Sequence, residues 1–125
     1  MVLASTCAVR QVLHKRAEQK RESAYQLLLR SYSEDLKPGM ARQDVENYLN
    51  GKGARFSQMC CVAQNRDALD DITKIGQELA PWYCSVQNIY VAFQFTPAGR
   101  DNALRAEKSD RLISITIIRR LEGCL

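Results

Sequence analysis

The feature that most constrains the fold is a change in the spacing of apolar residues near residue 54. Before this point they recur every three or four positions, as on one face of a helix. Beyond it they alternate with polar residues, most regularly in segments 88–96 and 111–120, as in half-buried strands. The 125 residues suffice for one domain with its own core. The pattern therefore predicts an α+β domain with N-terminal helices and a C-terminal antiparallel sheet.

Two helices are predicted in the N-terminal part. The first covers residues 9–33 and ends before Pro38, which disfavours helix at the residue before it. The second covers about residues 41–50, where Val45 and Leu49 form an apolar stripe at helical spacing that we expect to face the sheet.

Three strands are predicted, at residues 54–63, 88–96 and 111–120. The polar segment 64–81 is expected to be a long connection, with a short fourth strand near residues 71–75 left open. The predicted sheet therefore has three strands, or four if that segment pairs.

The last two strands suggest their own register. If paired residue numbers sum to about 208, every apolar residue on one face meets another. The resulting pairs are Phe95 with Ile113, Phe93 with Ile115, and Val91 with Ile117. The same sum places Cys84 opposite Cys124, although a shift of two residues would also keep the faces matched.

Positive charge is concentrated at the N-terminus. Residues 1–30 carry six Lys or Arg against two Glu, a net charge of +4, whereas the other residues sum to zero. We therefore divide the chain into a basic helical arm, residues 1–35, and an α+β domain, residues 36–125. Anionic membrane or partner contact is expected at Lys15, Arg16, Lys20 and Arg21. A solvated helix face without a ligand is the alternative.

Four of the five cysteines fall in the predicted sheet region. In a three-stranded meander, Cys60, Cys61, Cys84 and Cys124 gather at one end of the sheet. Neighbouring residues of a strand point to opposite faces. We therefore predict two disulfides, each joining one of Cys60 and Cys61 to one of Cys84 and Cys124. A zinc site and reduced, inert thiols are the alternatives.

Two segments carry a resemblance to a known family. The segment Leu36–Leu49, which reads LKPGMARQDVENYL, resembles the opening motif of the SmpA/OmlA (BamE-like) outer-membrane lipoproteins. Trp82 with Tyr83, and the strand Tyr90–Phe95, are similar to that family's Trp-x-Tyr and aromatic strand. The resemblance covers about residues 36–120. It implies two helices followed by three strands, a fold also seen in the β-lactamase-inhibitor-protein group, and a binding or scaffold role without catalysis.

Cys7 has two interpretations. The segment Leu3–Cys7 resembles the end of a bacterial lipoprotein signal, which makes Cys7 a candidate for lipidation. An ordinary free thiol near the N-terminus is the alternative.

No catalytic site, cofactor site or metal site is predicted. His14 is the only histidine and is expected on the surface of the arm. The sequence has no Ser-His-Asp set, glycine-rich phosphate loop or metal-ligand spacing. The adjacent acids Asp70 and Asp71 are expected to be solvated turn residues. Trp82 and Tyr83 are expected to pack against the cysteines, with a partner-binding patch as the alternative.

The hypothesis that unites these features is a non-enzymatic binding or scaffold module of the bacterial cell envelope. Its disulfides favour an oxidising compartment such as the periplasm, with or without a membrane anchor. Its partner is expected to be a protein. A cytosolic nucleic-acid-binding protein using the basic arm is an alternative, which the lack of an aromatic sheet platform disfavours. A thiol-dependent enzyme is another, although no Cys-x-x-Cys pair is present.

Overall fold

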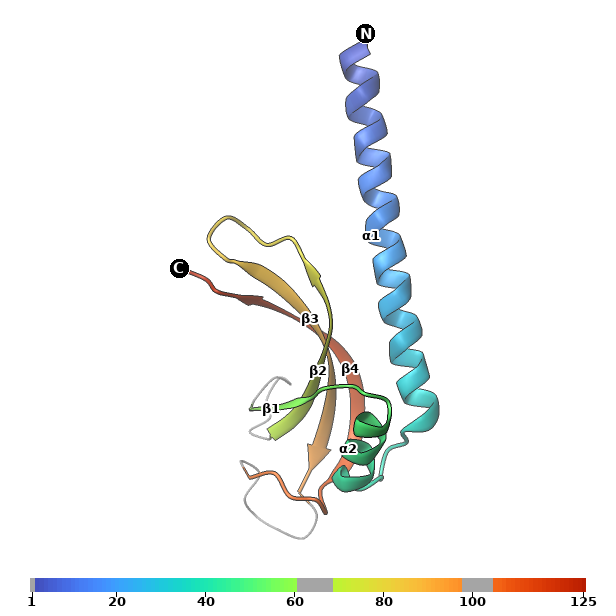
Figure 1. Ribbon diagram of the computed structural model, residues 1–125, viewed down its shortest axis with the longest axis vertical. Coiled ribbons are helices and arrows are strands. Elements are labelled where there is room, and N and C mark those ends of the chain that lie inside the picture. Colours follow the sequence, from blue (N-terminus) through green and yellow to red (C-terminus); the bar gives the residue numbers. More distant parts are fainter. Residues whose placement is uncertain (1, 61–68, 98–104) are drawn as a thin grey trace.

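A computed structural model of the chain describes residues 2–60, 69–97 and 105–125. It consists of a long helix, a short helix and a strongly twisted sheet, as Figure 1 shows. Helix α1 spans Val2–Asp35, and helix α2 spans Arg42–Gly51. Both predicted helices are therefore confirmed, and α1 begins earlier than its apolar pattern indicated.

The sheet has four strands, which run antiparallel in the order β1-β2-β3-β4. The strands are β1 Ser57–Cys60, β2 Leu69–Glu78, β3 Val86–Thr96 and β4 Arg111–Glu122. The predicted α+β class is confirmed, and the sheet takes its four-stranded form. The prediction of a long connection over residues 64–81 is wrong for residues 69–78, which form a strand of ten residues. The part of that prediction at residues 64–68 lies outside the described residues.

The register of β3 against β4 agrees with the sequence prediction over most of its length. Phe93 pairs with Ile115, and Val91 pairs with Ile117. A bulge between Gln94 and Phe95 then shifts the register by one residue, so Phe95 lies opposite Leu112. The predicted pair of Phe95 with Ile113 is therefore wrong at this end of the strand, where Leu112 is buried and Ile113 is 41% exposed.

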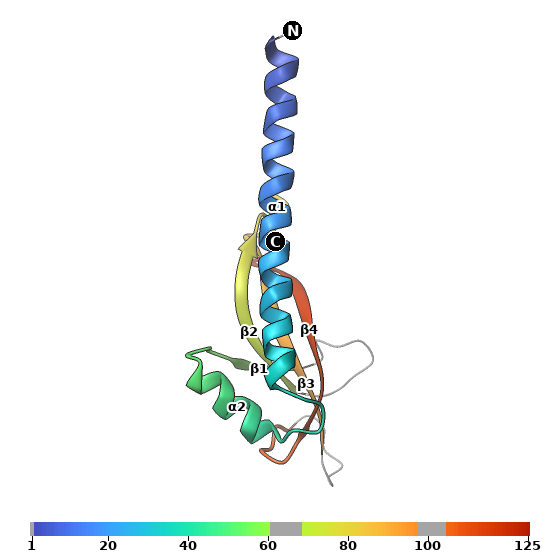
Figure 2. The same cartoon turned by 90° about the vertical axis from the view of Figure 1, so that its right-hand side faces the viewer.

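Both helices cover the same face of the sheet (Figure 2). The core lies between the helices and this face of the sheet. Val45 and Leu49 of α2 are fully buried, as their spacing predicted. They pack with Phe93 and Leu112 of the sheet in one apolar cluster. Ala41 precedes α2 without a capping side chain, and the helix ends in a turn that Gly53 completes at φ 71°.

Helix α1 packs on the sheet only through its second half, and its first half extends past the sheet (Figures 1 and 2). Tyr25 and Tyr32 are each 7% exposed and face the strands, whereas Val9 and Leu13 are 55% and 58% exposed. A helix turns by about 100° per residue. The apolar residues therefore face the sheet at Tyr25 and Tyr32, whereas those before Lys15, Val9 and Leu13, point away from it. This change of side explains why the helix has no single apolar face.

The ring of Tyr25 on α1 packs closely against Gly76 of β2. A Cβ atom on Gly76 would lie 2.4 Å from the hydroxyl oxygen of Tyr25. A side chain at this position would have to displace the Tyr25 ring, so the glycine allows this close packing of ring on strand.

Candidate functional site

Five exposed apolar side chains, among them the three most exposed of the described residues, lie at one end of the sheet, in the β2–β3 connection and near the end of β4. We call this group the braced tip, and it comprises Leu79, Trp82, Tyr83, Leu121 and Leu125. A disulfide between Cys84 and Cys124 joins its two segments. The backbone N–H of Leu125 also donates to the carbonyl of Tyr83 at 2.8 Å. The N–H of Ser85 donates to the carbonyl of Glu122 at 3.0 Å. The tip is thus held by one covalent bond and a set of backbone hydrogen bonds.

The side chains of the braced tip point into solvent despite this rigid support. Leu79 is 90% exposed, Trp82 is 87% exposed, and Leu125 is fully exposed. The rings of Trp82 and Tyr83 lie edge to face, 5.8 Å apart. The expectation that Trp82 packs against the cysteines is therefore wrong. Isolated exposed apolar residues are ordinary, whereas clusters of them mark interaction sites. The alternative, a partner-binding patch at Trp82 and Tyr83, stays a prediction.

The predicted cysteine cluster does not form. Cys84 and Cys124 are bonded to each other, so neither is bonded to Cys60 or Cys61. Cys60 also takes part in a disulfide and pairs in register with Leu69 at the start of β2, at the other end of the sheet. The reason is the extra strand. Because β2 lies between β1 and β3, it reverses the direction of β1 and carries Cys60 away from Cys84. Cys61 lies outside the described residues.

The candidate residues of the basic arm divide into two groups. Lys15, Arg16 and Lys20 are exposed, and within the described residues none of them takes part in an ion pair. Arg21 instead faces the sheet, where its Nε lies 2.9 Å from a carboxylate oxygen of Glu78. Cys7 is an exposed free thiol near the projecting end of α1. Its lipidation stays a prediction.

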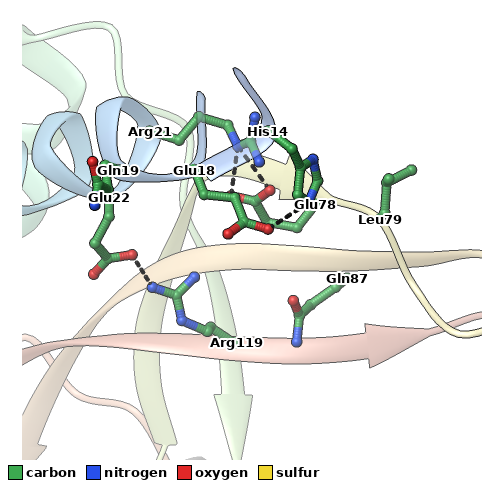
Figure 3. A pocket seen from close by; sticks show the side chains of 9 residues that line it. All are labelled: His14, Glu18, Gln19, Arg21, Glu22, Glu78, Leu79, Gln87 and Arg119. Atoms are coloured by element: carbon green, nitrogen blue, oxygen red, sulfur yellow. Dashed lines mark hydrogen bonds and ion pairs between the residues drawn. The ribbon is translucent and has the colours of Figure 1, made fainter. Parts of the chain in front are cut away.

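An open groove runs between the middle of α1 and strands β2 to β4, and Figure 3 shows the residues that line it. Two ion pairs cross it, Arg21 with Glu78 and Arg119 with Glu22, and His14 Nε2 lies 2.7 Å from a carboxylate oxygen of Glu18. Hydrogen bonds from Gln26 and Arg119 lower the pKa of Glu22. Because both arginines of the groove are paired with carboxylates on the opposite element, these contacts link the helix to the sheet.

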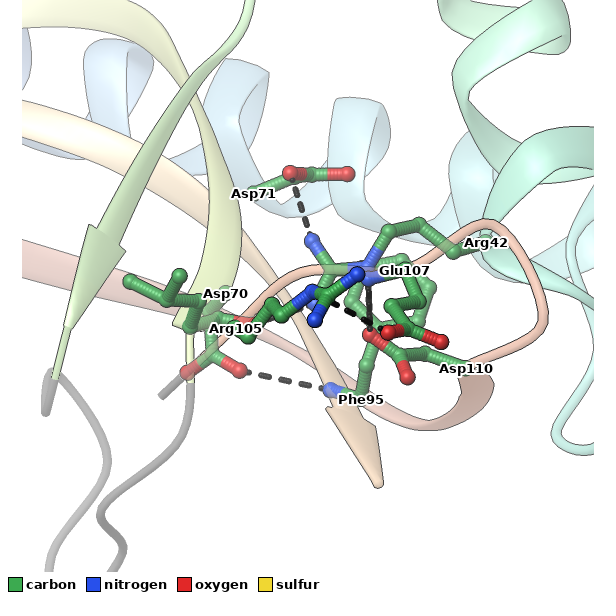
Figure 4. Close-up of polar contacts among 8 residues, drawn as sticks. Arg42, Asp70, Asp71, Phe95, Arg105, Glu107 and Asp110 are labelled. Carbon is green, nitrogen blue, oxygen red and sulfur yellow. Dashed lines mark hydrogen bonds and ion pairs between the residues drawn. The ribbon is translucent and has the colours of Figure 1, made fainter. Parts of the chain in front are cut away.

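A second polar cluster is buried at the end of the sheet that is remote from the braced tip (Figure 4). Its centre is Arg42 of α2, which is 2% exposed. Its Nη1 donates to Asp71 Oδ1 at 2.9 Å, and its Nε donates to Asp110 Oδ2 at 3.1 Å. Its guanidinium also lies 4.1 Å from the centre of the Phe95 ring. We call Arg42, Glu46, Asp71 and Asp110 the buried charge cluster.

The cluster carries more carboxyl groups than cations, and this raises the pKa of one of them. Burial raises the pKa of Asp71 to about 8, and the neighbouring carboxyl of Glu46 adds to this, against the opposing pull of Arg42. Asp71 Oδ2 and Glu46 Oε2 are both buried and accept no hydrogen bond from a donor in the described residues. A proton shared between the two carboxyls satisfies both oxygens.

Sequence reasoning missed this cluster. The adjacent acids were expected in a solvated turn, but Asp70 is 1% exposed and Asp71 is fully buried in β2. Asp70 Oδ1 accepts a hydrogen bond from the backbone N–H of Phe95 at 3.3 Å. The alternation of Asp71 with Thr73 and Ile75 was a weak strand signal, but nothing local could show that an arginine of α2 would lie beside them. The cluster joins three segments, which are α2, β2 and the residues before β4, and this indicates a structural role.

Comparisons with known proteins add no identity. No protein-family model, no curated protein and no solved structure matches the chain. Within the described residues, no helix combines the length and the apolar character that crossing a membrane requires. The described residues also contain no group of three or more His, Cys, Asp or Glu arranged to hold a metal ion.

Proposed function

We propose that this protein is a non-enzymatic binding or scaffold module of the bacterial cell envelope, which holds a protein partner at its braced tip. The observation that carries the proposal is the exposure of Trp82 and Leu79, at 87% and 90%, on a backbone fixed by the Cys84–Cys124 bond. Trp and Tyr are the side chains most enriched among the anchor residues of protein interfaces.

The rigidity of the tip supports binding. A flexible loop loses conformational freedom when a partner orders it, and that loss reduces affinity. Here the turn and the C-terminus are already ordered by the disulfide and by the bond from Leu125 N–H to the Tyr83 carbonyl. Fully burying one side chain such as Leu79 stabilises a complex by about 1.5–3 kcal/mol. Several such side chains on one fixed surface suffice for a specific contact.

The disulfide supports the proposed location. Disulfide bonds persist in oxidising compartments such as the periplasm and are rare in the cytosol. The resemblance of residues 36–120 to the SmpA/OmlA (BamE-like) lipoproteins supports the same compartment and a binding role. A distant relative of that family, with its own cysteines and a longer basic helix, is the form we propose.

Photo-crosslinking in cells tests the partner site. Trp82 is replaced by the photoreactive residue benzoylphenylalanine in the full chain, and the cells are illuminated. We expect one discrete crosslinked protein from this position, and loss of at least nine-tenths of it when Leu79→Ser is added. Neither change should affect folding, since both side chains are exposed. The matched control places the same photoreactive residue at Gln43, which is exposed on α2.

Two results would contradict the proposed partner site. No crosslinked product from position 82, or the same products from position 43, would show that the tip is not a partner site. The location is tested in the same cells by trapping free thiols with a maleimide before lysis. We expect Cys84 and Cys124 to be unreactive, and full labelling of both would contradict an oxidising compartment.

A further inference from the structure

The projecting half of α1 has one face that is both apolar and basic. Three large apolar side chains of this half are about half exposed: Val9 at 55%, Val12 at 48% and Leu13 at 58%. At about 100° per residue, Arg16 and Lys20 fall within the same arc of about 100°. Leu27, which is 64% exposed, continues the line. We call these side chains the outward face, and they are Val9, Val12, Leu13, Arg16, Lys20 and Leu27.

The acidic residues of this half lie on the opposite side of the helix. His14, Glu18, Arg21 and Tyr25 mark the side toward the sheet, centred about 160° from the outward face. Glu18 pairs with His14, and Glu22 pairs with Arg119 of β4. In the described residues, Arg16 and Lys20 have no ion-pair partner. The outward face therefore presents unneutralised positive charge together with apolar surface.

This combination selects between occupants. A second copy of the chain would bring Arg16 and Lys20 against the same cations in either a parallel or an antiparallel helix pair, and like charges repel. A nucleic-acid backbone would use the cations but not Val9 and Leu13, since phosphate contacts are electrostatic. An anionic bilayer uses both, because apolar side chains enter the boundary of the acyl chains while Lys and Arg meet the headgroups.

We propose that the outward face of α1 docks on an anionic lipid surface, so that the helix lies along the membrane and the sheet stands off it. This surface is distinct from the braced tip and does not depend on a protein partner there. Arg10 and Lys15 flank the outward face and add to the attraction, since each basic residue near an anionic membrane strengthens binding.

Vesicle binding by the full chain tests the proposal. The probe is vesicles of phosphatidylcholine with 30% phosphatidylglycerol, compared with pure phosphatidylcholine, at low salt. We expect binding to the anionic vesicles only, with Arg16→Glu plus Lys20→Glu weakening it at least tenfold. Leu13→Ser should weaken it severalfold even in high salt, where charge is screened. The matched control reverses Arg55 and Lys108, two exposed cations of the domain, and should bind as the parent chain does.

Three results would overturn the proposal. They are no binding of the parent chain to anionic vesicles, equal loss of binding in the Arg55 and Lys108 control, and tighter binding to duplex DNA than to vesicles at the same salt. A Trp82→Ser variant separates this surface from the braced tip. We expect it to bind vesicles unchanged, and loss of binding in this variant alone would assign lipid contact to the tip instead.

Discussion

The two ends of the sheet are stabilised by opposite means. At the end near α2, charged side chains are buried: Arg42, Asp71 and Asp110 are each at most 2% exposed. At the other end, apolar side chains are exposed around the Cys84–Cys124 bond, with Trp82 at 87%. Each end thus reverses the usual distribution of polar and apolar residues, in which charges face water and apolar groups do not.

The buried ion pairs of Arg42 and the Cys84–Cys124 disulfide require different surroundings. An ion pair strengthens as water is excluded, so Arg42 needs the apolar layer that buries it. A disulfide needs no burial, so it holds the tip in shape while leaving the side chains of the tip free. The first kind of brace suits the inside of a domain, and the second suits a surface that must be rigid and available to a partner.

Removing Arg42 should produce the largest loss of stability. Arg42→Ala removes the cation that the buried carboxylates of Asp71 and Asp110 both contact, and breaking a buried ion pair in this way costs about 3–5 kcal/mol. We expect urea unfolding to show a loss of this size in the free energy of unfolding. The control Arg55→Ala, at an exposed arginine, should change it by less than about 0.5 kcal/mol. A similar small change for Arg42→Ala would mean that the cluster does not hold α2 on the sheet.

Removing the disulfide should lower the free energy of unfolding by less than Arg42→Ala does, and its effect should be confined to the braced tip. Cys84→Ser combined with Cys124→Ser opens a link across 40 residues of sequence, which typically contributes about 2–4 kcal/mol. We expect amide hydrogen exchange to speed up in residues 79–86 and 121–125 while α2 stays protected. Cys7→Ser is the control and should change nothing, since Cys7 is an exposed free thiol. Faster exchange throughout the sheet would contradict a local role.

A third expected effect is a pH dependence of stability that comes from Asp71. Its pKa of about 8 in the folded chain lies above its ordinary value of 3.8. Between these values the folded state binds a proton that the unfolded state has lost, so stability falls as pH rises from about 5 to 8 and then levels. Asp71→Asn should abolish this slope in urea unfolding measured across that range. Asp44→Asn, at an exposed aspartate of α2, should leave the slope as it is.

The fold could be predicted where the signal was periodic. The helical spacing around Val45 and Leu49, and the alternation in β3 and β4, are properties of adjacent residues, and both were confirmed. The bulge after Gln94 could not be predicted, because it depends on which of Leu112 and Ile113 fits the core under α2. Strand β2 was underestimated because Asp70 and Asp71 resemble turn residues unless their buried partners are known.

The sequence identified several residues of the candidate site, but not how they are bonded or exposed in the fold. The register placed Cys84 opposite Cys124, but a bond between them was not predicted. The predicted bridges to Cys60 and Cys61 were wrong because they assumed three main strands. Trp82 and Tyr83 were identified as candidates, but exposure depends on what lies beside them in space. The division into an arm, residues 1–35, and a domain, residues 36–125, stays a prediction.

The contact between Tyr25 and Gly76 lies close to the end of α1 that is held on the sheet, so a small displacement there is enlarged at the other end of the helix. The helix is anchored near Leu36, about 16 Å from Tyr25 along its axis at 1.5 Å per residue, and it extends about 35 Å beyond Tyr25 to Val2. Raising the helix by about 1 Å at Tyr25 would therefore move its far end by about 3 Å. A side chain at position 76 that displaced the helix, and not the Tyr25 ring alone, would thus change the angle at which the far end of the helix meets whatever surface it contacts, several helical turns away.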